Sequence, residues 1–388
     1  MTVNETPTVP VDTASGDATE HAAAVDDAIE AWLRFATAAD TATDTAPGTG
    51  ESPVRQVAYG VLADRRMLLA LAEALPDRPP GLVLATSRMI AGTDEVITGG
   101  YNPWRDWVEE HWAELLEEVR ARTVQANVVN RAAALLPALG AIQRVWGGGP
   151  LAILEVGCSA GLLLQLDRFR YVYETPYGTV QVGPPDSPVT VTCTTTGDVP
   201  VPADPPVITW RAGLDPRPLY VTDRRDRAWL EAMTVWPGQD VRRAQHRAAV
   251  DLAAADPPYI VLGGAGQLHD VAATMPADVT RVVIDYGVGH CMTAGQRAAY
   301  AAAIQDLGLH HVSADTPACL PRPAPLDGTG HRPCRRPDNE DGVPGGAPVD
   351  PITFVLQLDG RAVGLCELNA HRLYWRPALP GRRTGATA

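Results

Sequence analysis

The residues best suited to chemistry form the segment 155–161, of sequence EVGCSAG. A continuous apolar run at 151–156 leads into it, and an apolar stretch at 162–169 follows it. This pattern predicts a buried strand that ends in a tight turn before a helix. In an open α/β sheet, ligands bind beyond the carboxyl ends of the strands, where glycines let a ligand approach the backbone. We therefore expect a binding site at this turn.

The acid at the start of this segment indicates the kind of ligand. Glu155 lies two residues before Gly157, and the spacing acid-x-Gly-x-small-x-Gly differs from the Gly-x-Gly-x-x-Gly fingerprint of dinucleotide-binding proteins. It resembles the first motif of S-adenosylmethionine-dependent methyltransferases, with Ser159 in place of the usual middle glycine. The resemblance implies S-adenosylmethionine as a cofactor, held by Glu155, Gly157, Ser159 and Gly161.

The same turn also matches Gly-x-Ser-x-Gly, the nucleophile elbow of α/β-hydrolases. Ser159 would then form an acyl-enzyme, and Asp285 with His290 or His371 would complete a triad. Against this alternative, the residues before 147 have helical patterns rather than the strands that normally precede such an elbow. A third alternative is a repurposed methyltransferase fold without methyl transfer, which performs another substitution or elimination or serves a partner subunit.

Other polar residues fall where predicted strands end. Arg211 and Asp215 end one strand pattern. Asp285 ends another, and His290 follows it. Because these positions share the carboxyl edge with the glycine turn, we expect Arg211 to bind substrate and His290, Asp285 or Asp215 to act as the catalytic base.

A further set of candidate substrate-binding residues precedes the turn. Gln125, Asn127 and Arg131 lie at the start of a predicted amphipathic helix, in which Asn127 and Arg131 are i, i+4 neighbours. A helix that covers the carboxyl edge of the sheet would use them to line a substrate pocket. The histidines and cysteines show no recognised ligand spacing, so we expect no metal site.

Composition excludes several functional classes. The chain has 388 residues with 45% hydrophobic and 20% charged residues, which are ordinary globular values. Its net charge of −14 disfavours nucleic acid and anionic membrane surfaces as partners. All 32 basic residues are arginine, so a Schiff-base lysine and a phosphate-loop lysine are excluded. A small-molecule substrate is the expected partner, and a homodimer or partner subunit stays open.

The cysteines and the amino-terminal residues indicate in which cellular compartment the protein is found. The six cysteines are scattered without a CxxC pair, which is typical of a reduced chain. The first residues lack both a cationic region and an apolar core, and no apolar run reaches membrane-spanning length. We expect a cytoplasmic protein.

The elements that position these residues alternate between strand and helix from residue 147 onward. Strand patterns occur at 151–156, 189–193, 207–210, 259–263, 281–286, 352–358 and 361–368. Only Asp359-Gly360 separates the last two, which is a strong hairpin signal. The predicted fold is therefore α/β, a doubly wound sheet that is mostly parallel, with an antiparallel C-terminal hairpin and an N-terminal helical cap.

Composition shifts predict the domain boundaries. Apolar periodicity indicates an amphipathic helix over 102–119 and a second over 124–142, which contains Pro137. The segment 314–351 is rich in proline and glycine, and we expect this insertion to be either a mobile lid or disordered. The expected organisation is a disordered tail at 1–24, a helical cap region at 25–146, a Rossmann-like methyltransferase-fold domain at 147–376 and a tail at 377–388.

Several segments together resemble the bacterial family called domain of unknown function 2332, which is regarded as methyltransferase-like in fold. The resemblance covers nearly the whole chain after the tail. The segments that carry it are Ser52-Pro53, RTVQANVVNR at 122–131, EVGCSAGLLLQLDRFRY at 155–171, WRAGLD at 210–215, Trp229-Leu230 and Trp236-Pro237.

This resemblance implies a methyltransferase-like fold and, for an active member, a transferase that acts on a small molecule. The chain departs from the pattern at Val128 and Thr194, where the family tends to have acids. The second departure matters because methyltransferases usually hold the ribose hydroxyls with an acid after the second strand. Asp198 is a nearby substitute.

Overall fold

The computed structural model describes residues 18–38, 52–145, 148–319 and 353–375. The chain forms two compact units, one made of residues 1–128 with 219–257, the other of 129–218 with 258–388. Within the described residues, no helix is long and apolar enough to cross a membrane. The predicted tail at 377–388 and most of the predicted insertion, residues 320–351, lie outside the described residues.

The first unit is helical in all its described elements. Its helices are α1 (Ala18–Ala38), α2 (Pro53–Ala63), α3 (Arg65–Ala74), α4 (Pro80–Ala91), α5 (Glu95–Thr98), α6 (Tyr101–Glu110), α7 (Trp112–Ala121), α9 (Arg224–Thr234) and α10 (Asp240–Ala255). The last two come from a stretch that the strand and helix patterns assigned to the sheet domain. Both pack within the helical unit, and α9 contacts α4.

Helix α1 corrects part of the predicted N-terminal tail. Residues 18–24 belong to this helix, while residues 1–17 lie outside the described residues. Trp32 and Ala36 are buried, and α1 contacts α2 and α3. Tertiary packing of an apolar face supplies most of the stability of such a helix, which composition alone does not show.

The predicted amphipathic helix over 102–119 is two helices, α6 and α7, that meet at His111. The ring of His111 stacks on Trp107 at 4.4 Å, and its Nδ1 lies 2.9 Å from the carbonyl oxygen of Trp107. Trp104 and Leu115 are fully buried, so the predicted apolar face does face the core.

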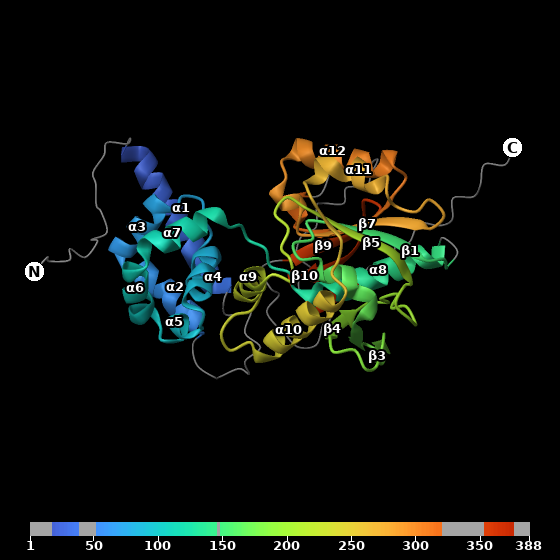
Figure 1. The fold of residues 1–388 in the computed structure, drawn as a ribbon, viewed down its shortest axis with the longest axis horizontal. Helices are drawn as coiled ribbons and strands as arrows, with labels where there is room; N and C mark the ends of the chain where they lie inside the picture. Colours follow the sequence, from blue (N-terminus) through green and yellow to red (C-terminus); the bar gives the residue numbers. More distant parts are fainter. Residues whose placement is uncertain (1–17, 39–51, 146–147, 320–352, 376–388) are drawn as a thin grey trace, which may run out of the picture. The chain divides into compact units, whose positions relative to one another are not determined.

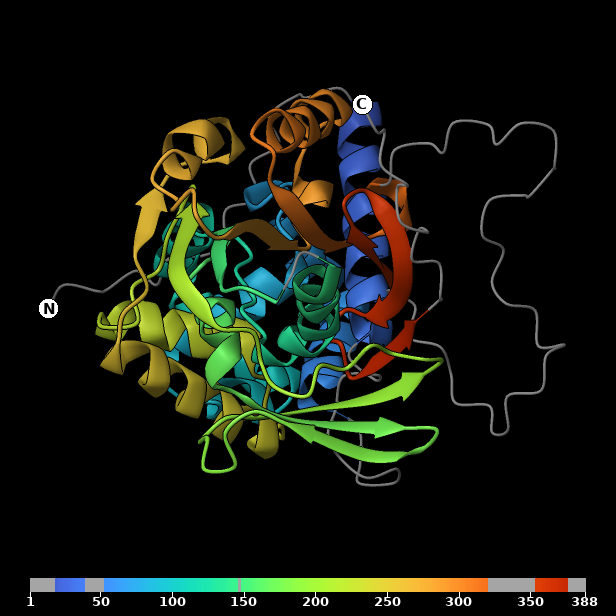
Figure 2. The same cartoon turned by 90° about the vertical axis from the view of Figure 1, so that its right-hand side faces the viewer.

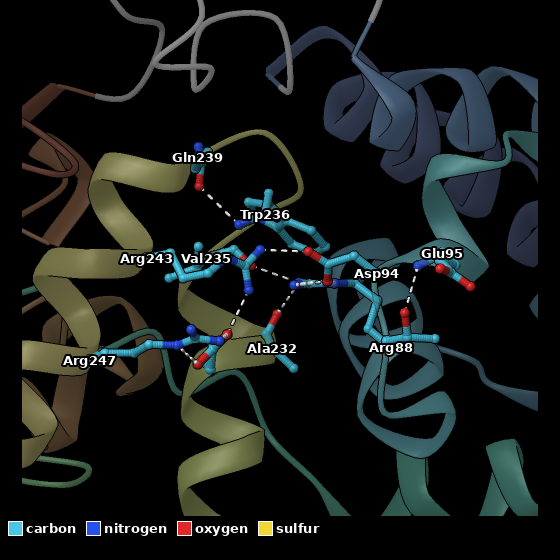
Figure 3. Close-up of polar contacts among 11 residues, drawn as sticks. Arg88, Asp94, Glu95, Ala232, Val235, Trp236, Gln239, Arg243 and Arg247 are labelled. Carbon is cyan, nitrogen blue, oxygen red and sulfur yellow. Dashed lines mark hydrogen bonds and ion pairs between the residues drawn. The ribbon is translucent and has the colours of Figure 1, made fainter.

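A buried arginine joins α4 to the end of α9 (Figure 3). Arg88 Nη1 donates hydrogen bonds to the carbonyl oxygens of Ala232, at 2.8 Å, and Val235, at 2.7 Å. Its Nε and Nη2 donate to Asp94 Oδ1 at 2.8 and 2.6 Å, and its guanidinium lies over the ring of Trp236. A single arginine therefore satisfies two carbonyls of a helix end that have no partner within the helix.

The same network continues onto α10 (Figure 3). Arg243 donates to Asp94 Oδ2 at 2.5 Å and to Glu231 Oε1 at 2.6 Å. Arg247 also donates to Glu231, at 2.8 and 2.9 Å. These contacts lower the pKa of Glu231 even though burial acts in the opposite direction. Alternating charges thus hold α4, α9 and α10 together.

The second unit contains one large mixed sheet. In the described residues its order is β3-β2-β4-β11-β10-β9-β8-β7-β1-β5-β6, with mostly parallel pairs and antiparallel pairs at β2/β3, β8/β9, β9/β10 and β10/β11. The strands are β1 (Leu151–Val156), β2 (Arg170–Thr175), β3 (Gly178–Val182), β4 (Thr190–Thr196), β5 (Ile208–Asp215), β6 (Ile260–Leu262), β7 (Thr280–Tyr286), β8 (His310–Asp315), β9 (Thr353–Leu358), β10 (Arg361–Glu367) and β11 (Arg372–Trp375).

Helices cover both faces of this sheet. Figure 1 shows α11 (Leu268–Ala272) and α12 (Ala294–Asp306) on one side and α8 (Ala132–Val145) on the other. Figure 2 shows the green strands β2 and β3 at one end of the sheet and the red strands β9, β10 and β11 beside them. The core against α11 and α12 includes Ala152, Leu154, Val156, Ala212, Leu214, Leu268, Val271 and Ile304.

The seven predicted strands are all present, and so is the predicted hairpin. Asp359 and Gly360 have φ of 49° and 73°, the left-handed conformation that a tight hairpin turn requires at both positions. The strand patterns missed β2, β3, β8 and β11. Residues 314–315, predicted to begin the insertion, end β8, and residues 317–319 form a short 3₁₀ helix, η5 (Pro317–Cys319).

Two predicted helices differ in the structure. Residues 122–128 are not helical, and α8 begins only at Ala132, after the 3₁₀ turn η1 (Val129–Arg131). The side chain of Asn130 explains the late start, since it pairs with the backbone of β4 by accepting from Thr192 N and donating to Thr192 O. The apolar stretch after the glycine turn is the 3₁₀ helix η2 (Leu162–Arg168) rather than an α-helix.

Candidate functional site

The strand order places β1 at a point where the chain changes direction across the sheet. After β4 the chain adds β5 and β6 on one side of β1, then crosses to add β7 and β8 on the other. All these pairs are parallel, so the carboxyl ends of five strands lie at one edge. Ligands of open α/β sheets bind at such switch points.

Four acids lie at or near the carboxyl ends of adjacent strands. Glu155 is on β1, Asp215 ends β5, Asp285 is on β7 and Asp315 ends β8. All four side chains are buried. Side chains alternate between the two faces of a strand, so these acids need not face the same side.

Glu155 and Asp215 share one face of the sheet. Their neighbours Leu154, Val156 and Leu214 pack in the core against α11 and α12, which puts both acids on the opposite face. Glu155 is in register with Gly213 of β5. A Cβ at Gly213 would overlap Sγ of Cys158, so the missing side chain leaves room for this cysteine.

The glycine turn folds back onto Asp215. Gly157, Ser159 and Gly161 have φ of 72°, 53° and 68°, so the turn is built from left-handed residues. The backbone N–H of Ser159 donates to Asp215 Oδ2 at 2.7 Å, and the N–H of Arg217 donates to Oδ1 at 2.7 Å. Asp215 therefore joins the turn after β1 to the end of β5.

Glu155 is a buried acid with an unused oxygen. Its side chain is 4% exposed, and Oε2 has no hydrogen-bond partner among the described residues. Burial raises the pKa of Glu155 well above its usual value, the nearby Asp215 raises it further, and Arg131 acts in the opposite direction. A buried polar atom without a partner is uncommon in folded proteins and indicates a functional position.

Arg131 is one of the cations on this face of the sheet. Its guanidinium lies 4.9 Å from the ring centroid of Tyr286, and its Nε donates to the carbonyl oxygen of Leu368 at 3.2 Å. It is close enough to Glu155 to oppose the rise of that pKa. The structure therefore brings Arg131, Glu155 and Asp215 together.

Asp285 belongs to a different cluster. Its Oδ2 accepts from Tyr300 Oη on α12 at 3.0 Å and lies 2.5 Å from His311 Nε2 on β8. This pairing places Asp285 on the α12 face, opposite Glu155 and Asp215. Burial and the neighbouring carboxylate raise the pKa of Tyr300 well above its usual value, so its phenol stays a donor.

His290, in the loop after β7, pairs with Asp315 at the end of β8. Its Nδ1 lies 3.3 Å from Asp315 Oδ1, and this contact raises the pKa of His290 to about 10. In this arrangement His290 holds its proton at neutral pH, which suits an acid better than a base. Val288, two residues earlier, contacts the turn, since a Cβ on Gly157 would lie 2.5 Å from Val288 Cγ2.

Arg211 occupies the middle of β5 rather than its end. It donates to both carboxylate oxygens of Asp167 at 2.8 Å and to the carbonyl oxygen of Leu164 at 2.6 Å. This bidentate pair fastens η2 to β5. Arg211, a candidate substrate-binding residue, thus holds η2, the segment that follows the glycine turn, against β5.

The remaining candidate residues lie elsewhere. Gln125 and Asn127 are in the helical unit, in a non-helical segment, so the predicted pairing of Asn127 with Arg131 as i, i+4 neighbours on one helix is wrong. Thr194 lies on β4, which five strands separate from β1, and the exposed Asp198 accepts from Tyr177 Oη at 3.1 Å. The acid next to the glycine turn is Asp215 instead.

The alternative triad is not assembled in the described residues. Ser159 Oγ is buried and has no hydrogen-bond partner there, while His371 Nδ1 contacts Asn130 and His290 contacts Asp315. Among the same residues, no group of three or more histidine, cysteine or acidic side chains could hold a metal ion.

Sequence reasoning missed three parts of this region. It did not single out Cys158 as a neighbour of the two acids, and it assigned no role to Asp315 or Cys319. A signal for Asp315 was available, because HHVSAD at 310–315 ends in an acid as RVVIDY nearly does at 281–286. No local pattern indicates that Cys158 would lie over Gly213.

One comparison with known proteins gives a match. The family model described as "Uncharacterized protein conserved in bacteria (DUF2332)" matches residues 89–322, more than half of the chain. No curated protein and no solved structure matches. The matched range contains the glycine turn, Asp215, Asp285 and Asp315. The chain therefore belongs to this bacterial family, DUF2332.

Proposed function

We propose that this chain is a methyltransferase-like enzyme that binds S-adenosylmethionine at the glycine turn and acts on a small molecule. The observation that carries the proposal is the pair of buried acids, Glu155 and Asp215, on one face of two adjacent parallel strands, with the turn at 157–161 folded between them. This pair lies at the switch point of the sheet, where such folds bind ligands.

The donor and acceptor groups present fit this cofactor. S-adenosylmethionine carries hydroxyl groups and an ammonium, which need acceptors. Glu155 Oε2 lacks a donor in the described residues, and each oxygen of Asp215 receives only one backbone N–H. Since a carboxylate offers about four lone-pair sites, Asp215 can accept further hydrogen bonds. When bound, the cofactor supplies an activated methyl group.

In this proposal Asp215 takes the position that the resemblance sought near Thr194. It ends β5, which borders β1, whereas β4 lies far along the sheet. Ser159 and Gly157 contribute a turn whose backbone a ligand can approach. Arg131 offers a positive charge on the same face for a carboxylate.

The residues of the chain would then align the acceptor and exclude water, which lowers the barrier without a covalent intermediate. His290 and Asp285 stay predictions as proton acceptors. Asp285 is already paired with His311 and Tyr300, and His290 with Asp315. Gln125, Asn127 and Arg211 likewise stay predictions as substrate-binding residues.

The test is isothermal titration of the full chain with S-adenosylmethionine and S-adenosylhomocysteine. We expect micromolar affinity, about −8 kcal/mol. Asp215→Asn should weaken binding about tenfold or more, because hydrogen bonds to charged acceptors contribute about 1.5 to 3 kcal/mol each. Asp198→Asn is the matched control, since Asp198 is an exposed acid near the position that the sequence suggested.

Glu155→Gln provides a second variant that keeps the side-chain volume. It should weaken binding while leaving the thermal midpoint near that of the unmodified chain, because Oε2 has no partner to lose. Absence of binding up to millimolar cofactor by a folded protein would refute the proposal. Equal losses in Asp215→Asn and Asp198→Asn would refute the assignment of Asp215.

One observation favours a serine hydrolase as a second candidate. Ser159 has φ of 53° in a strand-turn-helix setting, and strained left-handed residues other than glycine cluster at functional sites. Labelling of Ser159 by a fluorophosphonate, lost in Ser159→Ala, would support it. Cofactor binding that survives Ser159→Ala would favour the first proposal, since the turn offers its backbone N–H groups regardless of the side chain.

A further inference from the structure

A small cavity lies between α9 and α10 of the helical unit, apart from the glycine turn. Its volume is about 160 Å³. A cavity of about 150 Å³ can bind benzene, so this one has room for a ligand of about six non-hydrogen atoms. We call it the α9/α10 cavity. The residues that line it come from these two helices and are Arg227, Glu231, His246, Arg247, Val250 and Asp251.

His246 is a buried member of this lining whose polar atoms are unused. The residue is 2% exposed, and neither ring nitrogen has a hydrogen-bond partner among the described residues. Buried polar atoms are nearly always hydrogen-bonded, so an unpartnered imidazole that borders a cavity indicates that a ligand supplies a partner. Burial lowers the pKa of His246 to about 4, so the ring is neutral at neutral pH and either nitrogen can carry its N–H, depending on the tautomer.

Two ion pairs between α9 and α10 also belong to the lining. Arg227 Nη2 donates to Asp251, and Arg247 donates to Glu231 from Nε at 2.9 Å and from Nη2 at 2.8 Å. Because a guanidinium carries five N–H groups, both arginines keep donors that no other described residue uses. The side chains of Arg227 and Arg247 are 39% and 61% exposed, so a solute can reach these donors.

The charges at this place suit an anion better than a cation. Both acids of the lining are already paired with arginines. No group of three histidine, cysteine or acidic side chains in the described part of the chain could hold a metal ion. The ion pairs at and next to the cavity carry one net positive charge, since they join four arginines to three acids: Arg88, Arg227, Arg243 and Arg247 with Asp94, Glu231 and Asp251.

We propose that the α9/α10 cavity binds a small tetrahedral oxyanion such as phosphate, held by N–H groups of Arg227 and Arg247 and by one ring N–H of His246. Hydrogen bonds between a guanidinium and phosphate are charge-assisted, and the planar fork of arginine matches phosphate oxygens. Phosphate has fewer non-hydrogen atoms than benzene, so the volume accommodates it. This inference is independent of the proposed function, because no residue of the cavity belongs to the pair of Glu155 and Asp215.

The first experiment is isothermal titration of the full chain with inorganic phosphate at constant ionic strength, with chloride as the balancing anion. We expect a dissociation constant of about 1 mM or lower. Arg227→Gln should weaken binding about tenfold, because it removes a charge-assisted hydrogen bond. Arg65→Gln is the matched control, since it removes the same charge from an exposed position on α3 that does not line the cavity. Absence of binding up to tens of millimolar phosphate, or equal losses in the two variants, would overturn the proposal.

The second experiment observes His246 directly. In a chain with isotopically labelled histidine nitrogens, the ring signals of His246 are the magnetic resonance signals that His246→Leu removes. Phosphate should shift these signals. His246→Leu should weaken phosphate binding about threefold or more, the effect of one neutral hydrogen bond, while the thermal midpoint without phosphate stays near that of the unmodified chain. Unchanged His246 signals at saturating phosphate would contradict the assignment of the imidazole.

A titration with glycerol phosphate distinguishes two sources of the oxyanion. Weaker binding than that of inorganic phosphate would support the site and identify its ligand as the free ion. Equal or tighter binding, with the same loss in Arg227→Gln, would support the site and identify its ligand as the end of a phosphoester.

Discussion

Replacing Arg88 with methionine should destabilise the helical unit by about 3 to 5 kcal/mol, the range for removing one partner of a buried ion pair. Only 3% of the Arg88 side chain is exposed. The change removes its hydrogen bonds to Asp94 and to the carbonyl oxygens of Ala232 and Val235. Methionine keeps an apolar stem against Trp236 but leaves both carbonyls without these donors.

The magnitude follows from which groups lose their partners. Each buried acceptor left unsatisfied costs about 1 to 3 kcal/mol, and two carbonyls are affected. The energetic cost at Asp94 is smaller, because Arg243 still donates a hydrogen bond to its Oδ2 at 2.5 Å. For a unit of this size, the total corresponds to a fall in thermal midpoint of about 6 to 20 °C.

The assay is urea unfolding followed by tryptophan fluorescence, since Trp236 lies directly against the Arg88 guanidinium. Arg247→Met is the matched control. The Arg247 side chain pairs with Glu231 but is 61% exposed, so this substitution should lower the free energy of unfolding by less than about 1 kcal/mol. If Arg88→Met and Arg247→Met were destabilised to the same small extent, the reasoning about the buried helix end would be refuted.

Three further perturbations test other parts of the chain. Gly157→Ala introduces a Cβ 2.5 Å from Val288 Cγ2 at a φ of 72°, so it should lower the thermal midpoint and weaken ligand binding by titration. Pairing raises the pKa of His290 to about 10, above the unfolded value of about 6.5, so its stabilisation is complete below about pH 6.5 and is lost as the pH rises toward 10. His290→Gln should flatten the decline in thermal midpoint over that range, and an identical pH profile would argue against the pairing. Burial lowers the pKa of His246 to about 4, so stability should fall as the pH drops from about 6.5 toward 4. Both ring nitrogens of His246 lack partners in the described residues, so His246→Leu should remove this fall without loss of stability at pH 7.

Local pattern determined most of the strands and the turn of the candidate site. The apolar run at 151–156 is β1, and the left-handed residues of the turn include the expected Gly157 and Gly161. The Asp359-Gly360 hairpin is present as predicted. These features are encoded within a few residues, by side-chain periodicity and by the backbone freedom of glycine, so a single sequence suffices to find them.

Other local predictions failed where distant contacts outweighed propensity. The predicted helix over 124–142 begins only at Ala132, because Asn130 bonds to the backbone of β4 instead. Residues 18–24, predicted to belong to the tail, are part of α1, which the packing of Trp32 stabilises. In both cases the deciding partner lies in another element, and the sequence does not name it.

Only the tertiary structure decided which acids meet. The order of strands in the sheet places Asp215 beside the glycine turn and removes Thr194 from it. Alternation across the strands then separates Asp285 from Glu155. Sheet order depends on long-range pairing and crossover connections rather than on local pattern. The sequence by itself therefore determined the elements and the turn, and their arrangement in space determined the candidate site.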